Sequence, residues 1–82
     1  MLKKFFQNRI QKDQAKLEEA RKKCIGVLQQ KGLSNEEINK VEGKSFKKAA
    51  SAYVDRPNIQ AALKIYFKTL QEEALKIGYD VA

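Results

Sequence analysis

The stretch KGLSNEEI, residues 31–38, decides the fold, because it predicts the end of one helix and the start of the next. Gly32 suits the left-handed position just after a helix, where a residue without a Cβ carries no steric penalty. Leu33 would then fold back onto Leu28 in the last turn of that helix. The stretch therefore predicts a tight corner between two helices.

The second half of the stretch predicts how the next helix begins. Ser34 is a suitable N-cap, and Glu37 three residues later completes a capping box with it. Leu33 and Ile38 occupy the two ends of a hydrophobic staple around the same cap. Four independent local rules thus agree on a helix-turn-helix corner at residues 31–38.

Upstream of the corner, residues 3–31 predict one long amphipathic helix. Its apolar stripe has spacings of four and three residues and is interrupted only by the polar Asp13. A helix of this length would measure ~42 Å, which exceeds the diameter expected for a compact 82-residue domain with a radius of gyration of ~12 Å. The helix either kinks near residues 11–14 or projects and pairs with a second copy, so we expect a homodimer. The stripe consists of Phe6, Ile10, Leu17, Ala20, Cys24 and Val27, widened by Phe5 and Leu28.

Downstream of the corner, residues 35–42 predict a second helix, which Gly43 can end. Ser45 can cap a third helix over residues 45–54, and one uninterrupted helix through Gly43 is the alternative. Pro57 breaks the chain and suits the first position of a last helix over residues 57–77, which Gly78 ends. Inward positions are Ile38, Val41, Phe46, Ala49, Ala50, Tyr53, Val54, Ile59, Leu63, Tyr66, Leu70, Ala74 and Ile77, with Phe67 beside them.

No segment shows the alternation of a strand or the turn of a hairpin. The sequence therefore predicts an all-α fold, a small bundle of three to four helices with a long N-terminal helix, forming one domain over residues 1–82. A chain of this size buries only ~60–65% of its unfolded surface, so the core is small.

The residue types argue against most enzymes. The chain has no histidine and a single cysteine, which removes His-based triads, His metal sites and a disulfide framework. Cys24 falls on the apolar stripe, where we expect a buried, inert thiol. Adjacent carboxylates such as Glu18 and Glu19 diverge by ~100° on a helix, so they do not form an acid–base pair. We expect a protein that is not an enzyme, with no cofactor and no metal.

No apolar run is long enough to span a bilayer, and the run after Phe6 turns polar too soon for a signal peptide. Residues 2–12 are basic and carry two phenylalanines, but packing against the core or a partner explains them better than contact with a membrane surface. A cytoplasmic location fits the lone cysteine.

The net charge of +7 is uneven, since residues 1–31 hold nine basic and three acidic side chains. Such a surface attracts acidic partners, although lysines also keep small helical proteins in solution. Two basic sets stand out. The first set lines one flank of the long helix at a spacing of seven, and the second follows the corner. They are Arg9, Lys16 and Lys23, and Lys40, Lys44, Lys47 and Lys48.

Residues 24–43 resemble the helix-turn-helix of phage repressors, with Gly32 at the turn glycine and Ile38 and Val41 at buried positions of the second helix. The resemblance implies reading of DNA by residues 35–42. Three departures oppose it: the large Leu28, the polar Lys31, and carboxylates at the start of the second helix that repel phosphates.

The sequence as a whole favours a small helical binding module, such as a regulator, inhibitor, immunity factor or adaptor. It would act on an acidic protein partner through the two basic sets. Nucleic acid bound by the same side chains is the alternative, with phosphates tracked by the lysines and bases stacked on Phe46 and Tyr53.

Overall fold

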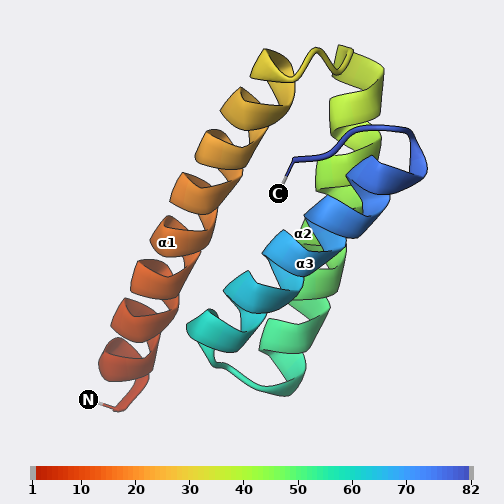
Figure 1. Ribbon diagram of the computed structural model, residues 1–82. Coiled ribbons are helices and arrows are strands. Elements are labelled where there is room, and N and C mark those ends of the chain that lie inside the picture. Colours follow the sequence, from red (N-terminus) through yellow and green to blue (C-terminus); the bar gives the residue numbers. More distant parts are fainter. Residues whose placement is uncertain (1, 82) are drawn as a thin grey trace.

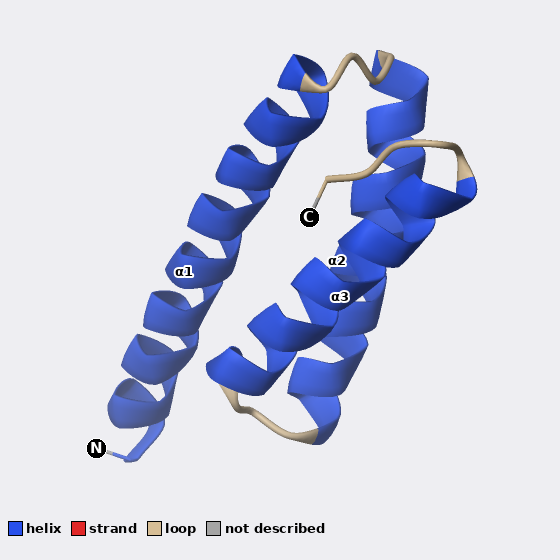
Figure 2. Cartoon of the chain, in the orientation of Figure 1, coloured by secondary structure: helices blue, strands red, loops and turns tan. Residues whose placement is uncertain are grey.

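The computed structural model describes the backbone of residues 2–81 and the side chains of residues 9–81. It contains three helices in the order α1 (Leu2–Gln30), α2 (Asn35–Asp55) and α3 (Ile59–Lys76), with no strand among the described residues. Figure 1 shows the three helices as one bundle, and Figure 2 shows that only short loops and the C-terminal segment lie outside helices. The all-α prediction is confirmed. The side chains of Phe5 and Phe6 lie outside the described part.

The corner forms as predicted. Gly32 has a φ of 93°, and the N–H of Leu33 donates to the carbonyl of Leu28 at 3.2 Å, which is the closing bond of a Schellman motif. Ser34 is the N-cap of α2: its Oγ accepts from the N–H of Glu37 at 3.2 Å, and its own N–H donates to Glu37 Oε1 at 2.8 Å. Both halves of the capping box are therefore present.

Helix α2 runs through Gly43 without a break, so the expectation of a separate helix starting at Ser45 is wrong. Ser45 does not cap. Its side chain is fully buried, and its hydroxyl donates to the carbonyl of Val41 at 2.7 Å, one turn back. A serine satisfied in this way sits inside a helix instead of starting one. Of the two alternatives, the uninterrupted helix is the observed one.

Helix α3 begins two residues later than predicted. Asn58 is its N-cap and accepts from the N–H groups of Gln60 at 3.0 Å and Ala61 at 3.2 Å. Pro57 therefore precedes the cap and is not the first helical residue. The other end follows the prediction, because Gly78 has a φ of 94° and Tyr79 N–H closes onto the carbonyl of Ala74 at 2.9 Å.

Helices α1 and α2 form an antiparallel hairpin. Arg21 contacts Glu42, Asp13 contacts Tyr53, and Arg9 reaches Pro57, so residue numbers rise on one helix as they fall on the other. Helix α1 is continuous through residues 11–14. From Arg9 onward it contacts the rest of the chain. The kink predicted near residues 11–14 does not form, and a hydrogen bond within the chain explains the polar Asp13 on the apolar stripe. Its side chain turns inward and accepts a hydrogen bond from the Tyr53 hydroxyl.

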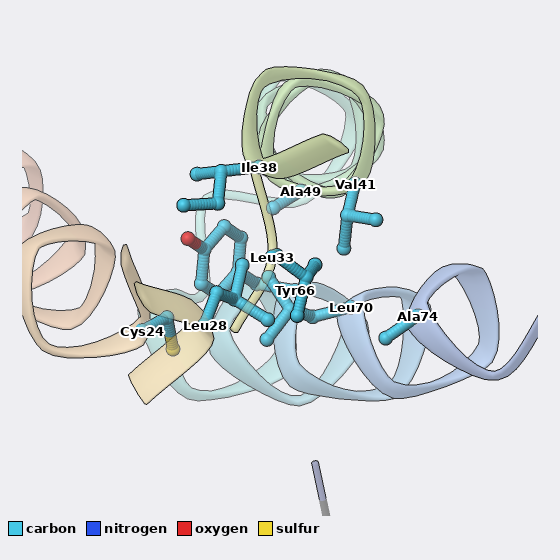
Figure 3. Packing of buried hydrophobic residues seen from close by; sticks show 9 residues of the cluster. All are labelled: Cys24, Leu28, Leu33, Ile38, Val41, Ala49, Tyr66, Leu70 and Ala74. Carbon is cyan, nitrogen blue, oxygen red and sulfur yellow. The ribbon is translucent and has the colours of Figure 1, made fainter. Parts of the chain in front are cut away.

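The apolar core gathers at the end of the bundle that carries the corner, with α2 and α3 in closer contact with each other than with α1. Figure 3 shows Tyr66 of α3 among side chains of α1, of the corner and of α2. The core cluster consists of Cys24, Leu28, Leu33, Ile38, Val41, Ala49, Tyr66, Leu70 and Ala74. Phe46 and Leu17 are partly buried against it.

Several predicted core positions are more open than the periodicity suggested. Ile10, Val27 and Ile77 are each 40–42% exposed, and Val54 is 80% exposed. The elongated shape, with extents of 48 × 20 × 19 Å and a radius of gyration of 13.8 Å, explains this, because a slender bundle cannot cover both ends of its apolar stripes. No helix among the described residues is both long and apolar enough to cross a membrane.

Candidate functional site

The first basic set lies along the side of α1 that faces α3. Arg9 Nη2 donates to the carbonyl of Pro57 at 3.4 Å, just before α3. Lys16 and Lys23 are exposed and stand at the edge of a groove between the two helices. Lys23 also pairs with Glu19 at 3.5 Å on its own helix, an exposed contact that contributes little stability.

This α1–α3 groove has a volume of about 290 Å³. Its apolar residues are Ala20, Leu63 and Phe67, and Phe67 is 41% exposed. The charged residues at its border are Lys16, Lys23 and Glu19. An apolar floor between lysines is a surface that can accept an apolar side chain from a partner whose flanks are acidic.

The second basic set lies on α2, and all four of its lysines are exposed. Lys44 reaches across to Glu73 of α3 at 3.5 Å, while Lys76 approaches the same carboxylate at 3.1 Å. The hydrogen bond from Lys76, followed by the charge of Lys44, lowers the pKa of Glu73. Lys40, Lys47 and Lys48 form no ion pair within the described residues.

The two basic sets do not form one continuous surface. Lys16 and Lys23 border α3 at Leu63 and Phe67, whereas Lys44 borders it at Glu73. On a helix with 100° per residue, Glu73 points well away from the direction shared by Leu63 and Phe67. Lys44 therefore contacts a different side of α3 from Lys16 and Lys23.

The corner does not have the geometry of a DNA reader. A helix-turn-helix crosses its two helices at about 90–120°, whereas α1 and α2 run antiparallel with contacts along their length. The exposed end of α2 presents Glu36, and Glu37 is engaged in the capping box. The resemblance to phage repressors extends to the turn and stops there.

Sequence reasoning missed a buried polar network that joins all three helices. Arg21 of α1 donates two hydrogen bonds to Glu42 of α2, at 2.5 and 3.2 Å. The Tyr66 hydroxyl of α3 also donates to Glu42, at 3.2 Å. The Arg21 guanidinium also lies 3.9 Å from the ring centroid of Phe46 and pairs with Glu18 at 3.1 Å. Burial, reinforced by the charge of Glu42, raises the pKa of Tyr66.

The position of Glu42 was the available signal for this network. It sits between the buried Val41 and Ser45 on the inner face of α2, where an unpaired carboxylate would be costly. A cation was therefore required from another helix. Periodicity alone could not choose Arg21 from the many basic side chains of α1.

Cys24 is buried, as predicted, with 8% of its surface exposed. Burial raises the pKa of its thiol, and a protonated thiol inside a core is a poor nucleophile.

A second cavity, which we call the Asp13 pocket, opens at the end of the bundle away from the corner. It has a volume of about 330 Å³. The Tyr53 hydroxyl donates to Asp13 Oδ2 at 2.5 Å on its wall, and this bond raises the pKa of Tyr53. Its lining residues are Asp13, Gln14, Leu17, Glu18, Phe46, Ala50, Tyr53, Val54 and Ile59.

Among the described residues, no three histidine, cysteine or carboxylate side chains gather as a metal site would require. Comparison with protein families, with curated proteins and with solved structures gives no match to this chain.

Proposed function

We propose that the chain is a non-enzymatic helical binding module that acts on an acidic protein partner through the basic side of α1. The observation that carries this proposal is the α1–α3 groove, in which exposed lysines border an apolar floor. Burial of the floor would supply affinity, and the positive border would steer and select an acidic partner.

The spacing of the first basic set suits a helical partner. Arg9, Lys16 and Lys23 are seven residues apart, so their row extends for ~21 Å along α1. An amphipathic helix in the groove would place an apolar side chain against Leu63 and Phe67 and acidic side chains along that row. A role as a regulator, inhibitor, immunity factor or adaptor in the cytoplasm would fit a contact of this kind.

The proposal is tested with two matched charge-reversal variants. Lys16→Glu with Lys23→Glu alters the groove, and Lys47→Glu with Lys48→Glu makes the same change of charge on α2. Each protein is used to capture partners from a lysate of the native cells, with and without nuclease, and any captured protein is purified and titrated back. We expect an acidic protein that binds the original chain and the α2 variant, and loses at least tenfold in affinity for the groove variant.

Two results would refute the proposal. One is equal loss of affinity in both variants, which would assign binding to overall charge. The other is capture that disappears with nuclease, together with binding to random duplex DNA whose affinity falls linearly with salt on logarithmic axes. That second result would establish the alternative, nucleic-acid binding by the same lysines.

We also propose self-association as a separate property. Ile10 and Val27 belong to the apolar stripe of α1 and each expose about two-fifths of their surface, which contact with a second copy would remove from water. Sedimentation equilibrium at micromolar concentration tests it, since a single species of 9.4 kDa across the concentration range would exclude a dimer.

A further inference from the structure

The Asp13 pocket differs in character from the basic surface of the protein. It lies between α1, the last turns of α2 and the first residue of α3. Its volume of about 330 Å³ falls within the range of ~300–1,000 Å³ that is typical of small-ligand sites. Most of its wall is apolar, from Leu17, Phe46, Ala50, Val54 and Ile59.

Asp13 gives the pocket a carboxylate that forms no ion pair with a described residue. Its side chain is 7% exposed, and the structure gives it one hydrogen bond, from the neutral Tyr53 hydroxyl. No lysine or arginine of the described residues lies within ion-pairing distance of it. Arg9, one turn earlier, donates to the carbonyl of Pro57 and is the nearest cation, close enough for its charge to act on the Tyr53 hydroxyl but not to pair with Asp13. A buried carboxylate in this state is costly unless a cation joins it.

The other carboxylate of the pocket, Glu18, is exposed to solvent and has an ion-pair partner, which it shares with Glu42. Glu18 pairs with Arg21 at 3.1 Å, and that guanidinium also covers one face of Phe46. Asp13 is therefore the buried carboxylate of the pocket that forms no ion pair with a described residue, and the aromatic ring of Tyr53 and aliphatic side chains lie around it.

We propose that the Asp13 pocket binds a small organic cation, a primary ammonium carried on an aromatic or branched aliphatic body. The ammonium would donate hydrogen bonds to the Asp13 carboxylate, and the body would lie against Leu17, Val54 and Ile59. This site is independent of the proposed protein-binding groove, because it uses other residues and selects the opposite charge.

The test is a titration with 2-phenylethylamine, followed by backbone amide chemical shifts. Two control compounds each keep one feature of the amine. 2-Phenylethanol keeps the phenylethyl group but has no charge, and N-acetyl-lysinamide keeps the ammonium on the side chain of a lysine residue. We expect saturable binding of the amine with a Kd on the order of 1 mM, with shifts confined to residues around the pocket. The alcohol and the lysine derivative should each bind at least tenfold more weakly.

Variants locate the site. Asp13→Asn keeps an acceptor for Tyr53 and removes the charge, so amine binding should weaken at least tenfold. Ala50→Leu should fill the cavity and abolish binding of both phenyl compounds. Asp55→Asn makes the same chemical change as Asp13→Asn at an exposed position outside the pocket and should bind like the original protein. Circular dichroism confirms that each variant is folded.

The proposal fails if the alcohol binds the original protein as well as the amine does, because the pocket would then be merely apolar. It also fails if no saturable shift occurs up to 20-fold above the expected Kd, or if the shifts spread over exposed carboxylates. Tighter binding of N-acetyl-lysinamide than of the amine would reassign the pocket to a protein side chain. The first and last comparisons use the original protein, so an unfolded variant cannot obscure them.

Discussion

The two ends of the bundle are held together in different ways. At the corner end, apolar side chains from all three helices surround Tyr66, and the buried Glu42 is bonded to both Arg21 and Tyr66. At the open end, α1 is held to α2 by the bond between Asp13 and Tyr53, and a cavity lies beneath it. The comparison indicates that the corner end supplies most of the stability, while the open end is free to accommodate a ligand.

Removal of core volume should show the largest difference between the two ends. Leu28 is fully buried at the corner end, so Leu28→Ala should lower the free energy of unfolding by ~3–4 kcal/mol. Leu17 is half-buried at the open end, and Leu17→Ala should cost ~1–1.5 kcal/mol. Urea denaturation followed by circular dichroism measures both, and equal losses would contradict the comparison.

The partly buried ion pair between Arg21 and Glu42 should give the next largest effect. Arg21→Ala leaves Glu42 buried without its cation, so we expect a loss of ~3 kcal/mol. Lys23→Ala removes an exposed pair on the same helix and should cost less than ~0.5 kcal/mol.

A double variant distinguishes two cases. In one, the ion pair adds net stability to the fold; in the other, each charge only prevents the cost of leaving its partner unpaired. Arg21→Met with Glu42→Leu replaces the charges with apolar side chains, and most of the lost stability should return. A double variant as unstable as Arg21→Ala would show that the network itself stabilises the bundle.

The capping box at the corner should contribute a smaller amount. Ser34→Ala removes the acceptor for Glu37 N–H and should lower the free energy of unfolding by ~1 kcal/mol. Asn58→Ala removes the corresponding cap of α3 and is a matched comparison. If Ser34→Ala leaves the denaturation midpoint unchanged, the corner is held by its apolar contacts and the capping box adds nothing measurable.

The smallest effect should be the dependence of stability on alkaline pH. Burial raises the pKa of Cys24 above that of an unfolded thiol, which is ~8.5. The folded state therefore prefers the protonated thiol, and its stability is complete below pH ~8.5 and falls as the pH rises through the folded pKa. Unfolding midpoints between pH 7 and 10 should decline, and less so in Cys24→Ser. A thiol reagent that modifies the native protein as fast as the unfolded chain would contradict the burial of Cys24.

Prediction from sequence succeeded where the deciding interactions are local. The corner and the end of α3 depend on residues within one turn of Gly32 and Gly78, and both formed as expected. It was wrong at Ser45, because a serine can cap a helix or bond to the preceding turn, and burial on the inner face of α2 decided between them.

Asp13 shows why the open end was harder to predict. In a periodicity analysis, a carboxylate on an apolar stripe counts only as an interruption. Here the Asp13 carboxylate is buried because it accepts a hydrogen bond from Tyr53, forty residues away in the sequence. The same reasoning failed to find the Asp13 pocket. The positions of the two basic sets on separate sides of α3 also depended on how the helices pack, which no local pattern encodes.

Native-state hydrogen exchange within α1 tests the difference between the two ends most directly, since one continuous helix extends through both. Amides of residues 24–30 should exchange only by global unfolding. Amides of residues 12–18 should exchange through local opening that costs ~1–3 kcal/mol less, with protection at least fivefold lower after correction for intrinsic rates. Uniform protection along α1 would show that both ends are held equally, and would contradict the account.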